Sequence, residues 1–152
     1  MKLILLLLTS IVIVSCTQHD PIFHDTQGHS IQISKLEGKW LVVNYWAPWC
    51  HSCTKEIPEL NQFHKHNPQV HLYGVNFDKQ TPDDLKQIIN KLQIEFPVLT
   101  DNPSEAWHLE DIMTVPTTFI INPQGQVAEV IQRPVSEKML QEILQKLTAT
   151  NK

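Results

Sequence analysis

The chain has 152 residues, the length of one ordinary domain. Hydrophobic residues make up 41% of it and charged residues 18%, a balance that fits a globular core and excludes a disordered chain. Sixteen acidic residues outnumber twelve basic ones and no basic run occurs, so the sequence gives no sign of a nucleic-acid partner.

The first residues, MKLILLLLTSIVIVSC, have the features of an export signal. Lys2 gives a charged start, and residues 3–14 form an apolar run that is shorter than the ~20 residues of a membrane-spanning helix. The run ends in IVSC, which resembles the bacterial lipobox. An uncleaved apolar anchor with an incidental cysteine is the alternative.

This resemblance predicts the organisation of the whole chain. We expect a lipoprotein signal peptide over residues 1–15, acylation of Cys16, a lipidated tether over residues 16–21 and one domain over residues 22–150. Several acyl chains on one residue give stable anchoring. Both the lipidated form and an uncleaved anchor would place the domain on the periplasmic or extracytoplasmic side of a bacterial membrane.

The patterning of the mature chain alternates between strands and helices. A half-buried strand is expected over residues 29–34, a fully buried strand over 40–46, a helix from Cys50 to about His64 and a strand over 70–77. Thr81 and Pro82 predict the start of a second helix, whose apolar stripe is Leu85, Ile88, Ile89 and Leu92.

The remaining elements follow the same alternation. FPVLT (96–100) predicts a short strand and NPSEAWHL (102–109) a short helix. Residues 117–122 and 126–132 predict a hairpin around the turn 123–125, and a last helix begins near Ser136. This order predicts a three-layer α/β domain, a central sheet with helices on both faces.

Cys50 and Cys53 are the chemically suggestive residues. If Cys16 carries lipid, these two can pair only with each other or, transiently, with a partner. A disulfide that closes so small a loop would stabilise the fold little. A zinc site needs four ligands and a second cysteine pair is missing, while His64, His66 and His71 lie awkwardly far along the chain.

A reactive dithiol has a better physical basis. Cys50 is expected at the start of a helix, where free N–H groups and the helix dipole favour a thiolate. Cys53 would follow one turn later on the same side, able to resolve a mixed disulfide. His51 would lower the pKa of the thiol further if it is protonated or hydrogen-bonded; a solvated side chain is the alternative.

Histidines near the start of the domain give no clear site. His19, His24 and His29 are spaced five apart, which matches neither one face of a helix nor one face of a strand. We expect no metal site there and no cofactor other than the Cys50–Cys53 disulfide.

The segment WAPWCHSC resembles the active-site turn of the thioredoxin superfamily. CTKEIPEL after it and VPTTFIINPQGQV downstream resemble the TlpA/ResA branch, and the match runs from about Ile22 to Leu147. The resemblance implies a thioredoxin-like fold with a central mixed sheet. It also implies a membrane-anchored thiol-disulfide oxidoreductase, in which Cys50 and Cys53 carry the chemistry.

The resemblance assigns roles to residues around the dithiol. Trp49 and His51 beside Cys50, with Val115 and Pro116 of a cis-proline loop, would bind substrate. Trp49 would pack beside the dithiol, and Pro58 matches a helix-kinking proline.

Two polar residues complete the implied site. Glu56 matches an acidic residue near the sulfurs that could pass protons during exchange, and an exposed helix acid is the alternative. Asn44 stands where thioredoxins proper bury an aspartate, so proton handling should shift toward Glu56.

Two features depart from the family pattern. Asp111 stands where a glycine is common, which leaves the shape of the loop before Pro116 open. His51 and Ser52 stand between the cysteines where many members carry a proline. Since this dipeptide helps to set the redox potential, the direction of electron flow stays open.

These residues predict thiol–disulfide exchange that reduces disulfides of exported proteins. No nicotinamide or flavin fingerprint occurs, so electrons must come from another protein. The resemblance implies a membrane thiol reductase of the DsbD/CcdA kind as donor and apocytochrome c as the leading substrate. Alternatives are an oxidant that donates its disulfide to folding proteins, a copper-binding metallochaperone lipoprotein, and an assembly lipoprotein with an idle dithiol.

Overall fold

A computed structural model describes residues 20–78, 80–109 and 112–150. The expected signal peptide, Cys16, most of the tether, and Asp111 lie outside the described residues. The elements in chain order are β1 (Ile22–His24), β2 (Ser30–Gln32), the 3-10 helix η1 (Ile33–Leu36), β3 (Leu41–Trp46), α1 (His51–His66), β4 (His71–Asn76), α2 (Pro82–Leu92), β5 (Val98–Leu99), β6 (Thr117–Ile121), β7 (Val127–Ile131) and α3 (Glu137–Thr150).

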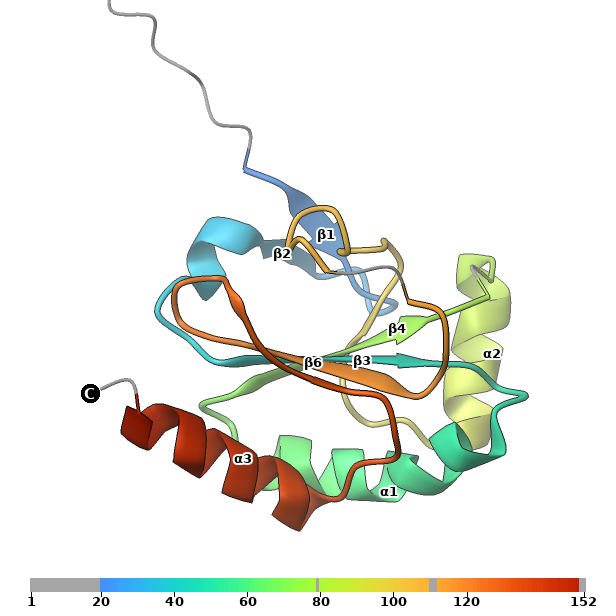
Figure 1. Ribbon diagram of the computed structural model, residues 1–152. Coiled ribbons are helices and arrows are strands. Elements are labelled where there is room, and N and C mark those ends of the chain that lie inside the picture. Colours follow the sequence, from blue (N-terminus) through green and yellow to red (C-terminus); the bar gives the residue numbers. More distant parts are fainter. Residues whose placement is uncertain (1–19, 79, 110–111, 151–152) are drawn as a thin grey trace, which may run out of the picture.

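A mixed five-stranded sheet forms the centre of the domain, with the strand order β5-β4-β3-β6-β7 (Figure 1). β3, β4 and β5 run parallel, whereas β6 is antiparallel to both β3 and β7. Asn44, in the middle of β3, lies opposite Gly74 of β4 on one side and opposite Thr118 of β6 on the other. Residues that lie opposite one another point to the same face of a sheet.

The two faces of the sheet are covered by different kinds of structure. α1, α2 and α3 contribute apolar side chains to a single cluster on one face, among them Leu60, Leu85 and Leu140. The other face is covered by η1, by the β1–β2 hairpin and by the loop that carries Trp107 and Leu109 (Figure 1). The expected α/β domain with a central mixed sheet is confirmed, and the helix on the second face is the short η1.

The predicted helix over residues 102–109 is wrong, because this segment consists of turns. The Leu109 N–H donates to the Ser104 carbonyl at 2.8 Å, and His108 has a φ of 49°. These features close a single turn and prevent a second one. Trp107 and Leu109 are both buried, so packing against the sheet determines the path of the chain here.

The predicted strand over residues 29–34 is too long. Only Ser30–Gln32 pairs with β1, a strand that the sequence pattern did not predict. The chain then turns into η1 and buries Leu36 in the core. A three-residue strand is too short for a clear alternation of polar and apolar residues. The pattern alone therefore does not separate β2 from the helical turn η1 that follows it.

The ends of the helices follow the expected signals. The Thr81 side chain accepts a hydrogen bond from the Asp84 N–H, and Pro82 is the first helical residue of α2. At α3 the Ser136 hydroxyl accepts from the Met139 N–H at 3.2 Å. Among residues 20–78, 80–109 and 112–150, no helix combines the length and the apolar character needed to cross a bilayer.

Gly74 of β4 is packed tightly against side chains of neighbouring segments. A Cβ atom at this position would lie 2.8 Å from Cε2 of Phe96 and 3.1 Å from Nε1 of Trp46. We expect Gly74→Ala to lower the free energy of unfolding by about 1–3 kcal/mol, because the core is close-packed and must shift to admit a methyl group. Urea unfolding measures this loss.

A compensating change tests the cause. Phe96→Leu removes the ring edge that the new methyl group would meet, so it should cost less stability in the Gly74→Ala background than in the wild type. Equal costs in both backgrounds would contradict the proposed clash.

Candidate active site

The dithiol lies where β3 passes into α1. The chain leaves β3 through a tight turn, in which the Cys50 N–H donates to the Ala47 carbonyl at 3.1 Å. Cys50 is the N-cap of α1, and the helix begins at His51. The expected position at a helix start is therefore confirmed. No acidic residue lies in the first turn of α1, so the helix N-terminus keeps its full attraction for a thiolate.

Cys50 and Cys53 are joined in a disulfide. The Cys53 N–H points at Cys50 Sγ at a distance of 3.2 Å, and the Ser52 hydroxyl lies 3.4 Å from the same sulfur. Cys50 retains 6% of its surface and Cys53 only 1%. The first sulfur is thus the one that a partner can reach, whereas the second is shielded beneath it.

The loop before β6 lies against the dithiol. The Val115–Pro116 peptide bond is cis, as the resemblance implies, and the Val115 carbonyl oxygen lies 3.6 Å from Cys50 Sγ. The Thr117 hydroxyl donates to the Thr114 carbonyl at 2.7 Å, which closes the loop on itself. Val115 is half-buried, so its backbone lies at the edge of the site.

Trp49 is fixed by contacts that the sequence did not suggest. Its side chain is 66% exposed, and its indole Nε1 donates to the Asp78 carboxylate at 2.9 and 3.0 Å. Its ring meets Phe77 edge-on, with 6.5 Å between the centroids. His51 is exposed, and its side chain makes no hydrogen bond within the described residues.

Several large apolar side chains are exposed, one just before the dithiol in the sequence and others in later loops. Trp49 and Phe77 form one group, and Met113, which is 85% exposed, lies in the loop before Pro116. Exposed apolar surface of this kind is typical of a site that binds another protein. Phe77 and Met113 were missed by the sequence reasoning, because a single apolar residue in a loop carries no pattern.

Glu56 is buried beside the dithiol and not exposed at the helix start. It retains 2% of its surface, one turn after Cys53 on the same face of α1. Oε1 accepts from Asn44 Nδ2 at 2.9 Å, and Oε2 accepts from the Val135 N–H at 2.8 Å. Burial raises the pKa of Glu56 to about 7, against the opposite effect of these two hydrogen bonds.

Asn44 links the carboxylate to the sheet. Its Nδ2 donates both to Glu56 Oε1 and to Thr118 Oγ1, the latter at 3.0 Å, while its own Oδ1 is buried without a partner in the described part of the chain. Thr118 and the Val135 N–H were also missed from the sequence. The available signal was Asn44 itself, a polar residue inside the buried strand LVVNYW that must find partners.

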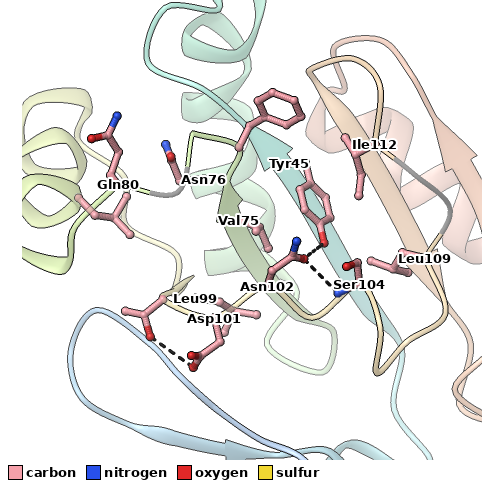
Figure 2. A pocket seen from close by; sticks show the side chains of 13 residues that line it. Tyr45, Val75, Asn76, Gln80, Leu99, Asp101, Asn102, Ser104, Leu109 and Ile112 are labelled. Carbon is pink, nitrogen blue, oxygen red and sulfur yellow. Dashed lines mark hydrogen bonds between the residues drawn. The ribbon is translucent and has the colours of Figure 1, made fainter.

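A cleft of about 720 Å³ opens at the same edge of the sheet (Figure 2). Because β3, β4 and β5 are parallel, their carboxyl ends meet there beside the dithiol. The Tyr45 hydroxyl donates to Asn102 Oδ1 at 2.8 Å across the cleft. Phe77 forms part of the lining, and its ring also meets Trp49.

Three of the histidines considered as metal ligands lie beside carboxylates. His24 pairs with Asp101 and His29 with Asp25, while His66 lies 2.9 Å from Glu137. Within residues 20–78, 80–109 and 112–150, no three His, Cys, Asp or Glu side chains converge in a way that could hold a metal ion.

A helix-capping C-x-x-C disulfide on this mixed sheet defines a thiol-disulfide oxidoreductase with a thioredoxin-like fold. Comparison with known proteins agrees with this class. The family model described as AhpC/TSA family matches residues 15–130. The chain belongs to that family.

Curated relatives of the chain include proteins of the ResA type. "Thiol-disulfide oxidoreductase ResA" of Bacillus subtilis is 30% identical over 125 residues, which cover 81% of this chain and 69% of the relative. The crystal structure of StoA from Bacillus subtilis has a TM-score of 0.69 at 26% identity and covers 82% of this chain and 95% of its own. A secreted thiol-disulfide isomerase from Corynebacterium glutamicum shares the fold, with a TM-score of 0.68 at 23% identity and coverage of 82% and 81%.

Proposed function

We propose that this oxidoreductase reduces disulfides in exported proteins. The Cys50 thiolate attacks a substrate disulfide, forms a mixed disulfide and expels one substrate thiolate. Cys53 then loses its proton and attacks Cys50 Sγ, which expels the second substrate thiolate. The expelled thiolates take up two protons, so the enzyme dithiol becomes a disulfide as the substrate gains two thiols.

The burial of Cys53 beside Glu56 is the observation that supports this mechanism most directly. Cys53 retains only 1% of its residue surface, so its thiol cannot give a proton to bulk water easily. Glu56 lies one turn further along α1 and has a pKa raised to about 7 by burial, so its carboxylate is a suitable base at neutral pH. Glu56 would take the Cys53 proton in the resolving step.

Substrate binding is assigned to the surface around Cys50. Trp49 and His51 offer exposed side chains, and the half-buried Val115 offers its backbone next to the cis Pro116. A peptide on this surface would place its disulfide at Cys50. The cleft beyond Phe77 has room for residues that flank the disulfide.

The location and the partners follow from the export signal and from the resemblance. Acylated Cys16 would hold the domain on the extracytoplasmic side of the membrane, six residues before β1. A membrane thiol reductase of the DsbD/CcdA kind would supply electrons, and the tether would raise its effective concentration. Apocytochrome c is the leading substrate.

A trapping experiment tests the proposal. Cys53→Ala should accumulate mixed disulfides between Cys50 and exported proteins, because the resolving thiol is missing. Mass spectrometry of the adducts from the native host identifies the substrates. The Cys50→Ser/Cys53→Ala double variant is the control, and equal adducts in both would contradict exchange through Cys50.

The direction of electron flow is tested separately. We expect a reduction potential closer to the ~−270 mV of thioredoxin than to the ~−120 mV of a strong oxidant. Equilibration with glutathione or dithiothreitol buffers measures it. A value at the oxidising end would replace disulfide reduction by disulfide donation.

A further inference from the structure

We propose that Thr118 is a positioning residue for the proton transfer of the resolving step, because its hydroxyl holds the Asn44 amide in the orientation that donates to Glu56. This inference rests on the proposed role of Glu56 as the base for Cys53. It adds a residue that touches neither the sulfurs nor the carboxylate.

The Asn44 amide is oriented by the group that it faces on α1. An ionised carboxylate can only accept hydrogen bonds, so the amide must turn its nitrogen toward Glu56. In that orientation Asn44 Oδ1 is buried without a partner in the described part of the chain, which costs free energy. The orientation therefore depends on both amide N–H groups being satisfied.

Thr118 satisfies the second N–H group. Its Oγ1 accepts from Asn44 Nδ2 at 3.0 Å, while Glu56 Oε1 accepts from the same nitrogen at 2.9 Å. Thr118 lies directly opposite Asn44 in the β3–β6 register and is fully buried, so water cannot replace its hydroxyl. In the described residues Asn44 is the only hydrogen-bond partner of this hydroxyl.

Among residues 20–78, 80–109 and 112–150, no charged side chain forms an ion pair with Glu56. In the described residues the Glu56 carboxylate is bonded by the Asn44 amide of β3 and by the Val135 N–H before α3. Cys53, one turn before it on α1, is held in a disulfide and does not titrate. Lys55 and Glu59, its charged neighbours on α1, are exposed. The hydrogen bonds to the carboxylate are therefore the main influence that lowers the pKa of Glu56 against the effect of burial.

If the Asn44 amide is held less firmly, the ionised form of Glu56 should lose more stability than the neutral form. The reason is that hydrogen bonds to a charged acceptor are stronger than those to a neutral one. We expect Thr118→Val to raise the pKa of Glu56 by about half a unit to one unit, the equivalent of about one hydrogen bond. Thr118→Ser keeps the hydroxyl and should restore the wild-type titration.

The measurement is the ¹³C NMR titration of glutamate carboxyls in the oxidised full chain, where no thiol titrates. Thr117→Val is the matched control: it removes a buried hydroxyl from the same strand, but Thr117 bonds to the Thr114 carbonyl and not to Asn44. It should leave the Glu56 titration unchanged. If Thr118→Val does not fold, Thr118→Ala carries the same expectation.

A second readout connects the shift to exchange. In Thr118→Val the pH midpoint of Cys53 resolution should move upward by the same amount as the Glu56 titration. An unshifted titration in Thr118→Val, or equal shifts in Thr118→Val and Thr117→Val, would overturn the role of Thr118. A shifted titration without any reduction of exported proteins would contradict only the proposed function, because the titration needs no substrate.

Discussion

Replacing Cys50 by serine is expected to reduce disulfide exchange to the rate without enzyme. Cys50 is the more exposed residue of the pair and caps α1, where the helix N-terminus stabilises its thiolate. A serine hydroxyl does not ionise near neutral pH and cannot form a mixed disulfide. Reduction of insulin, followed by its precipitation, measures the loss.

The Cys53→Ser variant is the informative control for this experiment. It retains the attacking thiol, so it should react once with a substrate disulfide and then stall, whereas Cys50→Ser should not react at all. Thermal unfolding of both variants shows whether the fold is kept. Equal rates of insulin reduction in Cys50→Ser and the wild type would remove the catalytic role of the dithiol.

Glu56→Gln is expected to change both the stability and the pH dependence of the protein. Burial raises the pKa of Glu56 from 4.5 to about 7, so the folded chain binds a proton between these values that the unfolded chain releases. The stabilisation that this bound proton gives to the folded chain is complete below pH 4.5 and is lost as the pH rises through 7. The wild type should therefore lose roughly 3 kcal/mol of unfolding free energy over this range.

Glutamine does not titrate, so the variant should lack this loss. Urea unfolding at a series of pH values measures the difference between the two profiles. Glu105→Gln, at an exposed position, should keep the wild-type profile. Parallel profiles for Glu56→Gln and the wild type would show that Glu56 is ionised as easily in the folded chain as in the unfolded one.

The same variant should slow the resolving step. General bases contribute roughly 10²–10⁴-fold to proton-transfer steps, so we expect a loss of at least about 10²-fold in the rate at which Cys53 resolves a mixed disulfide. In the wild type the rate of this step should rise as Glu56 ionises around pH 7. In Glu56→Gln this rise should vanish. Stopped-flow measurement with a mixed disulfide formed in advance isolates this step from the initial attack.

The sequence predicted the parts of the molecule that carry a periodic or capping signal. β3 was visible as a continuous apolar run, and α2 as a helical stripe behind Thr81 and Pro82. The C-x-x-C spacing and the resemblance then located the dithiol and Glu56. Each of these signals lies within a few neighbouring residues of the chain.

The rest of the site depends on contacts between distant segments. The Val135 N–H is a backbone donor, which any residue except proline could supply, so its contact with Glu56 leaves no trace in the sequence. Thr118 has the features of an ordinary strand residue until the β3–β6 register places it opposite Asn44. The turns over residues 102–109 were misread because core packing overrides local helix propensity.

The hydrogen bond from the Val135 N–H to Glu56 joins residues that are 79 positions apart. It connects the segment before α3 directly to the buried acid on α1. A mutation or a bound protein that pulls this distant end of the chain outward would take one donor away from that acid. Because that hydrogen bond favours the ionised carboxylate, its loss would raise the pKa of Glu56 without any change in the residues of α1 itself.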